Sequence, residues 1–314
     1  MSRRFSNPWA HPGHRFRDVL RWKLGLGPKE GISEAPDEPA GRVAWEREPV
    51  PERGWRVSWL GHASFLLEGC GRRLLVDPIF SEYCAPLRLR SLKRLVPPPC
   101  TIAGLGAIDS VLLTHGHYDH LDLPTLRALE GAPLMVVPEG HGRWMERRGF
   151  SEVRELSWFE TTVPFEGVEV TSTPAQHFTA RTPFDRNRGH WCGYRIEGGG
   201  VSLWHAGDSG WCPAFAEIGD RLGEVDFGMI PIGAYAPRWF MEPVHVTPEE
   251  AVEVFRATRC RRAVGMHWGT FRLTDEPSGE PPRRLERALS AGERDRFVTG
   301  AVGESWRIPG GKAS

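Results

Sequence analysis

The sequence predicts an α/β protein in which two β-sheets pack face to face with helices on the outside. Three observations support this architecture. From Trp55 onward, short apolar runs separated by glycine-containing turns indicate a meander of strands. A second group of such runs lies between Val168 and Ile232. Helical patterns follow each group, and helices that bury one stripe against a sheet produce layers of this kind.

Residues 1–50 are predicted to form an N-terminal arm and linker, and residues 51–314 a single large domain. Between Arg15 and Leu24, basic side chains are interleaved with apolar ones. This pattern is typical of a short amphipathic helix, which either lies on an anionic bilayer or packs on the domain with a solvated basic face. Residues 27–50 are rich in Gly, Pro and Glu and predict a loop.

Within the domain, apolar runs bounded by turn residues predict strands, and longer periodic runs predict helices. Strands are expected at Val57–Leu60, Ser64–Glu68, Leu74–Val76, 108–113, Leu134–Val137, Val168–Thr173, Gly193–Glu197, Val201–Trp204, Phe227–Ile232 and Ala263–Met266. Helices are expected at Pro124–Glu130, His141–Arg148, Pro248–Thr258 and Arg283–Ala291, and a hairpin at Phe297–Ile308. Thr247 and Glu250 have the spacing of a capping box. The basic and apolar stretch 81–100 is either plain surface or a contact for substrate or membrane.

Composition excludes several classes of protein. Apolar residues make up 40% and charged residues 25% of the chain, as in a soluble globular protein. The net charge of zero provides no global field for nucleic acid. No apolar run approaches the length of about 18 residues needed for a membrane span. The first residues lack the apolar segment of a signal peptide, so we expect a cytoplasmic protein. If the arm binds a bilayer, the protein would be peripheral on the inner face of the membrane.

The chain contains a concentrated set of metal-binding residue types after the predicted strand 108–113. His115, His117, Asp119 and His120 follow Thr114 directly. In an extended segment residues i and i+2 point the same way, so His115 and His117 can converge on one cation. Asp119 and His120 can reach a second. Imidazole and carboxylate ligands without a thiolate suit zinc, iron or manganese, and the six cysteines form no C-x-x-C pair.

Three further residues of these types follow predicted strands, at His177, Asp208 and His267. We expect His115, His117 and His177 to hold one ion. Asp119, His120 and His267 are expected to hold the other. Asp208 would bridge them with one oxygen on each ion. Three protein ligands and an open position mark a catalytic site, and two cations about 3.5–4 Å apart can activate a shared water and clamp a phosphoryl oxygen.

Several strings in the sequence carry a resemblance. Thr114–His120 matches the H-x-H-x-D-H signature of the metallo-β-lactamase superfamily. The strings 77–81, 206–215 and above all Pro231–Met241 resemble the branch formed by N-acyl-phosphatidylethanolamine-hydrolysing phospholipase D and its bacterial relatives. This resemblance implies a metallo-β-lactamase αββα four-layer sandwich, two zinc ions, and a phosphodiesterase reaction that releases N-acylethanolamine from a phospholipid. It also implies a membrane-associated homodimer, and the family's seven ligands fall on the seven positions named above.

Other residues are assigned roles around this centre. Asp77 and His62 are expected to orient ligands, although His62 could equally be a packed core histidine. Asp119 and Asp208 are expected to act in catalysis as well as in binding, and His245 to donate a proton to the leaving oxygen. Tyr118, Tyr235 and Trp239 are expected to contact substrate. The remaining candidates are expected to be structural, with Arg238 in a salt link, His205 in the core, and His11, His14, His141 and His190 on the surface.

Two alternatives remain open. Pro243 and Val244 stand where the animal enzyme of the resembled branch has Tyr and Gln, so a polar wall group is lost. This loss favours a soluble lactonase or small phosphodiester hydrolase of the same superfamily. A scaffold without activity would require a missing ligand, and none is missing. Redox chemistry on two irons is disfavoured because the flavin-linked di-iron members carry a carboxylate where His117 stands.

Overall fold

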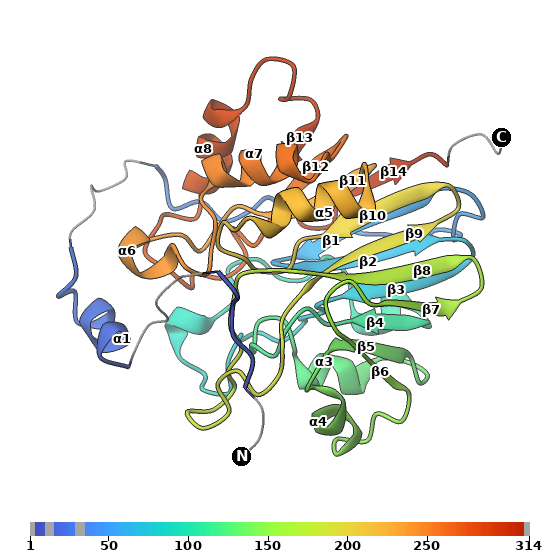
Figure 1. The fold of residues 1–314 in the computed structure, drawn as a ribbon, viewed down its shortest axis with the longest axis horizontal. Helices are drawn as coiled ribbons and strands as arrows, with labels where there is room; N and C mark the ends of the chain where they lie inside the picture. The colour runs from blue at the N-terminus through green and yellow to red at the C-terminus, as the bar shows by residue number, and fades with distance from the viewer. Residues whose placement is uncertain (1–3, 10–15, 29–34, 311–314) are drawn as a thin grey trace.

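The computed structural model describes residues 4–9, 16–28 and 35–310. Two seven-stranded sheets form the centre of the molecule (Figure 1). The first sheet contains β1 (Trp55–Gly61), β2 (Ser64–Gly69), β3 (Arg72–Val76), β4 (Ser110–Leu112), β5 (Leu134–Pro138), β6 (Val153–Leu156) and β14 (Ser305–Ile308). The second contains β7 (Thr161–Phe165), β8 (Val168–Thr173), β9 (Gly193–Gly198), β10 (Val201–His205), β11 (Phe227–Pro231), β12 (Ala263–Met266) and β13 (Phe297–Thr299).

The two sheets share one topology. In the first, β1, β2 and β3 are antiparallel neighbours, and β3, β4, β5 and β6 are parallel. In the second, β7 to β10 are antiparallel, and β10 to β13 are parallel. Parallel neighbours need a crossover connection, so the helices fall on the outer faces. The helices are α1 (Phe16–Lys23), α2 (Ile102–Leu105), α3 (Leu123–Ala128), α4 (Gly142–Glu146), α5 (Ala214–Leu222), α6 (Arg238–Met241), α7 (Pro248–Ala257) and α8 (Glu280–Ala288), with a 3-10 turn at Arg90–Leu92.

Alternation along the strands explains why both faces of the first sheet are buried. Phe65 and Leu67 of β2 belong to the core between the sheets. Leu66, between them, belongs to a second core with Leu126 of α3 and Met145 of α4. Side chains two apart share a face, so one apolar run can serve both cores. The predicted four-layer αββα sandwich is therefore confirmed, with α3 and α4 on one side and α5, α7 and α8 on the other (Figure 1).

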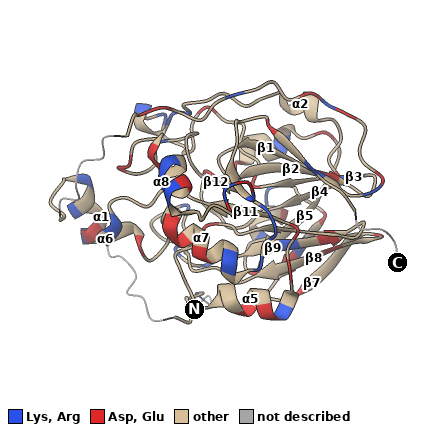
Figure 2. Cartoon of the chain, turned by 90° about the horizontal axis from the view of Figure 1, so that it is seen from above, with Lys and Arg blue, Asp and Glu red and all other residues tan. Residues whose placement is uncertain are grey.

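The outermost layer carries much of the charge. Figure 2 shows basic residues in blue and acidic residues in red along α5, α7 and α8, whereas the strands are mostly tan. One ion pair joins the last two of these helices, from Arg284 Nη2 of α8 to Glu249 Oε2 of α7 at 2.7 Å. Among the described residues, none of the helices has both the length and the apolar character required to cross a bilayer.

The hairpin predicted at Phe297–Ile308 is wrong. Residues 297–299 pair in parallel with β12 of the second sheet, whereas Ser305–Ile308 pairs with β1 of the first. The turn between them passes through Gly303, which has a φ of 100°. An uncovered edge strand exposes unpaired backbone groups. The two strands of the tail therefore pair with one edge of each sheet and not with each other.

The arm contacts the domain at several places. The Ala40 N–H donates to Gly269 O at 3.1 Å, and Trp45 is buried, with its Nε1–H donating to Ser58 Oγ at 3.1 Å. Farther upstream, Trp22 of α1 stacks on Phe240 of α6, with ring centroids 5.0 Å apart. A boundary at residue 50 stays a prediction, since these contacts describe packing and not a division into domains.

The capping box predicted at the start of α7 is present. Thr247 Oγ1 accepts the Glu250 N–H at 3.2 Å, and Glu250 Oε2 accepts the Thr247 N–H at 2.9 Å. We expect Thr247→Ala to lower the free energy of unfolding by about 1 kcal/mol, because the Glu250 N–H loses the hydroxyl that accepts it. Thr247→Ser keeps the hydroxyl and should lie close to the wild type. Urea denaturation of the three proteins checks this, and equal midpoints for the alanine variant and the wild type would contradict it.

Candidate metal centre

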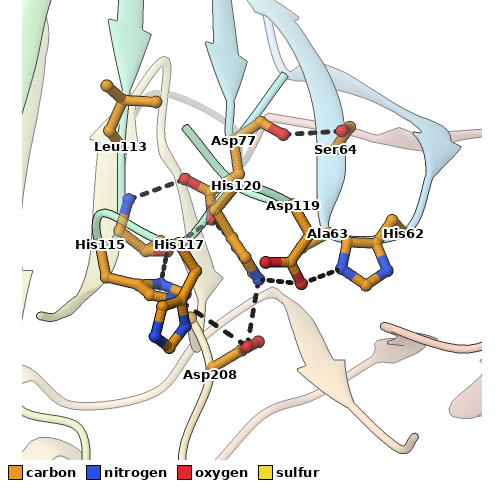
Figure 3. A network of polar contacts seen from close by, with 12 residues as sticks. His62, Ala63, Ser64, Asp77, Leu113, His115, His117, Asp119, His120 and Asp208 are labelled. Atoms are coloured by element: carbon orange, nitrogen blue, oxygen red, sulfur yellow. Dashed lines mark hydrogen bonds and ion pairs between the residues drawn. The ribbon is translucent and has the colours of Figure 1, made fainter. Parts of the chain in front are cut away.

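Four of the metal-type residues, His115, His117, Asp119 and His120, lie in the loop that follows β4, and Asp77 anchors the start of that loop. Asp77 follows β3, the parallel neighbour of β4, so the carboxyl ends of both strands meet at one edge. Asp77 Oδ1 accepts the Thr114 N–H at 2.7 Å, and Asp77 Oδ2 accepts the Thr114 hydroxyl at 2.5 Å. The Asp77 side chain is fully buried. Figure 3 shows it between the strands and the histidines.

These contacts also decide which nitrogen of each histidine carries the proton. His120 Nδ1–H donates to Asp77 Oδ2 at 2.7 Å. The Thr114 hydroxyl already donates its proton to Asp77, so it accepts from His115 Nδ1–H at 3.0 Å. His177 Nδ1–H donates to Val244 O at 3.0 Å. His115 and His177, whose pKa values burial lowers, therefore present an unprotonated Nε2, the form in which imidazole binds a metal. Burial opposes charge on His120, but Asp208 and Asp119 raise its pKa well above the usual value, so metal binding would displace a proton from its Nε2.

The first predicted ligand group converges. His115 Nε2 lies 2.8 Å from His117 Nδ1, and His177 Nε2 lies 3.3 Å from the same atom. Two nitrogens bound to one tetrahedral zinc ion, each about 2.0–2.1 Å from it, lie about 3.3 Å apart. The three rings come from the loop after β4 and from the segment after β8. Their spacing is close to that of the ligands of a single ion.

The second predicted group converges beside the first. Ligand atoms of Asp119, His120, His267 and also His62 all lie within 4.8 Å of one another. Asp119 Oδ2 is 3.5 Å from His120 Nε2 and 3.7 Å from His267 Nε2. His267 directly follows β12 and adopts a φ of 63°, a conformation uncommon for a residue with a Cβ. The end of β12 thus brings a ligand from the second sheet to the loop of the first.

Asp208 lies between the two groups. Its Oδ2 is 3.1 Å from His120 Nε2 and from His267 Nε2, and its distances to His177 Nε2 and His115 Nε2 are 3.8 and 3.9 Å. In Figure 3 Asp208 approaches the histidines from below, on the side opposite Asp77. Gly207 makes this approach feasible, because a Cβ there would lie 2.4 Å from Cys192 O.

The buried atoms at the centre fit a pair of divalent cations. His120 Nε2, His267 Nε2 and Asp208 Oδ1 are buried without a hydrogen-bond partner among the described residues. Buried polar atoms are otherwise almost always paired. Cations placed between the imidazole nitrogens and the carboxylates would give these atoms partners. The donor set of imidazole and carboxylate, without a thiolate, matches zinc, iron or manganese.

The electrostatics agree with this fit. Burial lowers the pKa of His177 to about 3 and that of His117 to about 4, so both are neutral ligands. Burial alone would raise the pKa of Asp208, but His120 and His267 outweigh it and hold that pKa well below the usual value. Burial opposes charge on His267 too, yet Asp208 and Asp119 raise its pKa to about 9. Metal binding would therefore release a proton from His267.

His62 contacts Asp119 at the edge of this cluster. Its Nε2–H donates to Asp119 Oδ2 at 2.9 Å, which leaves the other oxygen of Asp119 free. Burial lowers the pKa of His62 to about 4, so the ring donates as a neutral imidazole. His62 O accepts the Trp59 Nε1–H at 2.8 Å and the His267 N–H at 3.1 Å. The predicted roles of His62 and Asp77 as residues that orient ligands are consistent with these contacts.

A cavity of about 460 Å³ opens onto the cluster. Its polar end contains His117, Asp119, His177, Asp208, His245 and His267. Its other walls are largely apolar and include Val19, Trp22, Phe178, Phe240, Met241, Pro243, Val244 and Leu273. The His245 ring lies 5.2 Å from that of His177, and its Nδ1 is buried without a hydrogen-bond partner among the described residues. His245 is thus placed to act on a molecule bound in this cavity.

The three residues predicted to contact substrate lie elsewhere. Tyr235 is buried and its hydroxyl donates to Glu280 Oε1 at 2.7 Å. The Tyr118 hydroxyl donates to Arg181 O at 3.0 Å. Trp239 packs beside Arg21, whose guanidinium carbon is 5.4 Å from the ring centroid. None of the three lines the cavity. Trp22, Phe178 and Arg186 line the cavity instead, and the sequence did not indicate this. For Trp22, the amphipathic pattern of α1 was the one available indication.

Four of the structural assignments can be compared with the contacts. Arg238 forms the expected ion pair, with Glu250, and His205 is packed in the core, where its Nε2–H donates to Ala63 O at 2.9 Å. The surface position expected for His141 is wrong, because the ring is buried against the back of the metal loop and its Nε2–H donates to His190 O at 2.9 Å. His190 is half-buried. His11 and His14 lie outside the described residues.

The buried His141 makes stability depend on pH. Burial lowers its pKa to about 4 from the usual 6.5, so the unfolded chain binds more protons between these values. This contribution is complete above pH 6.5 and is lost as the pH falls toward 4. Between pH 7 and pH 5 the wild type should lose about 2 kcal/mol more unfolding free energy than His141→Gln. Urea denaturation at both pH values measures the difference, and parallel losses would contradict the assignment.

Comparison with known proteins gives the following similarities. The family described as "Beta-lactamase superfamily domain" matches residues 72–268. The "N-acyl-phosphatidylethanolamine-hydrolyzing phospholipase D 1" of Caenorhabditis elegans is 35% identical over 81% of this chain and 76% of its own length. The mitochondrial protein with the corresponding name from Saccharomyces cerevisiae is 34% identical, and the chain spans 55% of its length. The solved structure of Igni18, a metallo hydrolase from Ignicoccus hospitalis, has the same fold with a TM-score of 0.61, at 22% identity over 81% of this chain and 98% of that one.

Proposed function

From the premise that the chain belongs to the beta-lactamase superfamily, we propose that it is a dinuclear zinc phosphodiesterase of the phospholipase D type. That it is a metal-dependent hydrolase follows from its relatives. The proposed reaction releases N-acylethanolamine from N-acyl-phosphatidylethanolamine. The observation that carries the proposal is one cavity with a cluster of metal-type ligands at one end and an apolar wall at the other.

The chain's own residues can be assigned roles in this reaction. His115, His117 and His177 would hold one ion and Asp119, His120 and His267 the other, with Asp208 between them. Two bound cations would supply an activated water and positive charge for the phosphoryl oxygens. Asp77 and His62 keep the ligands oriented through the hydrogen bonds described above. His245 lines the cavity beside Asp208, where a ring N–H could hydrogen-bond to the leaving oxygen.

The walls of the cavity support a lipid as substrate. Trp22 of α1, Phe240 and Met241 of α6, and Leu273 form an apolar surface that can bury a hydrocarbon chain. Arg186 also lines the cavity and stacks over Phe178, with its guanidinium carbon 4.4 Å from the ring centroid. A guanidinium at this position can pair with the phosphodiester. We therefore place the acyl chain toward α1 and α6 and the phosphate toward the metal ligands.

A membrane surface is the proposed place of action. On and after α1, the side chains of Leu20, Leu24 and Leu26 are exposed, by 45%, 67% and 65%. Arg17, Arg21 and Lys23 lie on the same short segment. Apolar and basic side chains together favour peripheral binding to an anionic bilayer. We propose that the protein works on the cytoplasmic face of the inner membrane, as a homodimer, as the resemblance to its branch implies.

The direct test compares two substrates. Purified protein loaded with zinc is given N-acyl-phosphatidylethanolamine in mixed micelles, or a water-soluble lactone or phosphodiester. We expect release of N-acylethanolamine and phosphatidic acid from the lipid, identified by mass spectrometry. The rival candidate, a soluble lactonase or small phosphodiester hydrolase, is favoured by Pro243 and Val244 in the cavity wall. Turnover of the soluble substrate alone would reject the lipid proposal in favour of that rival.

The proposal also predicts how KM depends on the length of the substrate's acyl chain. Trp22→Ala should raise KM about 10-fold for a substrate with a 16-carbon acyl chain, because about 1.4 kcal/mol of apolar contact is lost. A substrate with a 4-carbon chain should be affected much less. Trp211 is 47% exposed and lies outside the cavity, so Trp211→Ala is the matched control. Equal changes in KM for both chain lengths would argue against an acyl site at α1.

A further inference from the structure

A second cavity, of about 380 Å³, lies behind the metal loop. It shares no lining residue with the cavity described above. The two are separated by the metal loop and by residues 178–189. His117 faces the first cavity and the neighbouring Gly116 faces the second. Likewise Arg186 and Asn187 face the first, whereas Arg181 and Arg188 face the second.

The second cavity is strongly basic. The arginines in its lining are Arg143, Arg147, Arg148, Arg181 and Arg188. Its one acidic lining residue, Asp185, uses Oδ1 to accept the backbone N–H groups of Arg181 and Thr182, at 3.0 and 2.8 Å. Within residues 4–9, 16–28 and 35–310, none of these five arginines forms an ion pair with a carboxylate. The lining therefore carries five positive charges against the single carboxylate of Asp185, although the chain as a whole is neutral.

Two of the arginines are held close together by an aromatic ring. The guanidinium carbons of Arg148 and Arg181 lie 3.5 and 5.1 Å from the centroid of the Trp144 ring. Like charges near one ring repel each other, and an anion bound beside them would lower that repulsion. Guanidinium groups present paired N–H donors that match phosphate oxygens.

We propose that this cavity is a second binding site, for a phosphate-type anion carrying more than one negative charge. The five arginines and the absence of ion-paired carboxylates among the described residues support it. The site does not depend on the reaction proposed above. Its ligand could be a free phosphate or the phosphomonoester headgroup of a lipid, since both offer the same oxygens. The experiment below distinguishes these two sources.

The site also contacts the metal loop. Arg181 Nη1 donates to Gly116 O at 2.9 Å and to Leu121 O at 2.8 Å, near the two ends of the loop that carries four of the proposed ligands. Gly116 N–H donates to Thr179 Oγ1 at 2.9 Å, and Thr179 lines the cavity too. Arg181 is for this reason unsuitable for mutation in a binding test. Arg143, Arg147 and Arg188 are exposed and make no such contact, so they can be removed without loosening the loop.

The pocket variant is Arg143→Ala, Arg147→Ala and Arg188→Ala combined. Its control combines Arg53→Ala, Arg283→Ala and Arg294→Ala, which removes the same charge from exposed arginines outside the cavity. Inorganic phosphate is titrated calorimetrically into both zinc-loaded proteins and the wild type. Phosphate bound at the metal centre is common to all three, so the difference between the two variants reports the second site. We expect phosphate to bind the pocket variant at least ten-fold more weakly than the control.

A second arm uses vesicles of phosphatidylcholine with one fifth phosphatidic acid, or with phosphatidylserine adjusted to the same surface charge. Cosedimentation lost by the pocket variant on phosphatidic acid alone would support the site and identify a lipid headgroup as its source. If the pocket variant loses binding equally to both kinds of vesicle and its phosphate affinity is unchanged, the arginines act only through their general charge, and the proposal is overturned. Equal phosphate affinity and equal vesicle binding in pocket variant and control would overturn it as well.

Discussion

Replacing Asp208 with asparagine should remove at least one metal equivalent and lower kcat/KM by about 1000-fold, or about 4 kcal/mol. The reason lies in the position of its Oδ2, which is 3.1 Å from both His120 Nε2 and His267 Nε2. Asparagine has the same shape, but it is neutral and presents an NH₂ group in place of one oxygen. The Oδ2 atom of Asp208 also lies 3.8 Å from His177 Nε2 and 3.9 Å from His115 Nε2, so it approaches both groups of histidines. Elemental analysis after gel filtration and a kinetic assay measure the two effects.

A matched substitution separates charge loss from general damage. Asp226 also sits next to a strand of the second sheet, where its Oδ2 accepts the Ser202 N–H at 2.9 Å. It belongs to none of the clustered ligand groups. Asp226→Asn should therefore keep its full metal content, although some stability is lost. Full activity with two metal equivalents in Asp208→Asn would refute the bridging position assigned to Asp208.

Asp77→Asn is the second substitution with a large expected effect, although Asp77 is no proposed ligand. Its Oδ2 accepts from both the Thr114 hydroxyl and His120 Nδ1–H. An amide NH₂ there would oppose two donors, or force the proton of His120 onto Nε2, the atom that faces the cation. We expect metal affinity to fall by about 10–100-fold and the free energy of unfolding by about 2 kcal/mol. Zinc titration against a chromophoric chelator and urea denaturation check both.

Variants of Thr114 test whether Asp77 affects metal affinity by orienting the ligand histidines. Thr114→Ser keeps the hydroxyl that joins Asp77 to His115 and should retain nearly all of the metal affinity. Thr114→Val removes the hydroxyl and frees His115 while leaving the bond from His120 to Asp77 intact. Its affinity should lie between those of the wild type and Asp77→Asn. If Asp77→Asn binds zinc as tightly as the wild type, the carboxylate does not orient the ligands.

The metal cluster could be predicted from the sequence because its signals are local. His115, His117, Asp119 and His120 lie within six residues, and His177, Asp208 and His267 each follow a strand that an apolar run predicts. Parallel strands and their neighbours deliver such positions to one edge of a sheet. The capping box of α7 is similarly local. In these cases the residues that decide the structure are close to one another in the chain.

The features that were missed depend on distant contacts. Trp22 reaches the cavity wall because α1 packs on Phe240, more than 200 residues away in the chain. The pairing of residues 297–299 and 305–308 with different sheets is likewise invisible in their own patterns. The strand Val153–Leu156 carries exposed Arg154 and Glu155 at a sheet edge, so it lacks the apolar run that predicts a strand. His141 is buried by the loops around Gly116 and Gly189, which its own neighbours in sequence do not indicate.

Anomalous diffraction at the zinc edge from crystals of the full chain tests the central claim most directly. Two peaks about 3.5–4 Å apart are expected. One should be bound by His115, His117 and His177, the other by Asp119, His120 and His267, with Asp208 reaching both. A single peak, or zinc bound away from these side chains, would contradict the dinuclear centre.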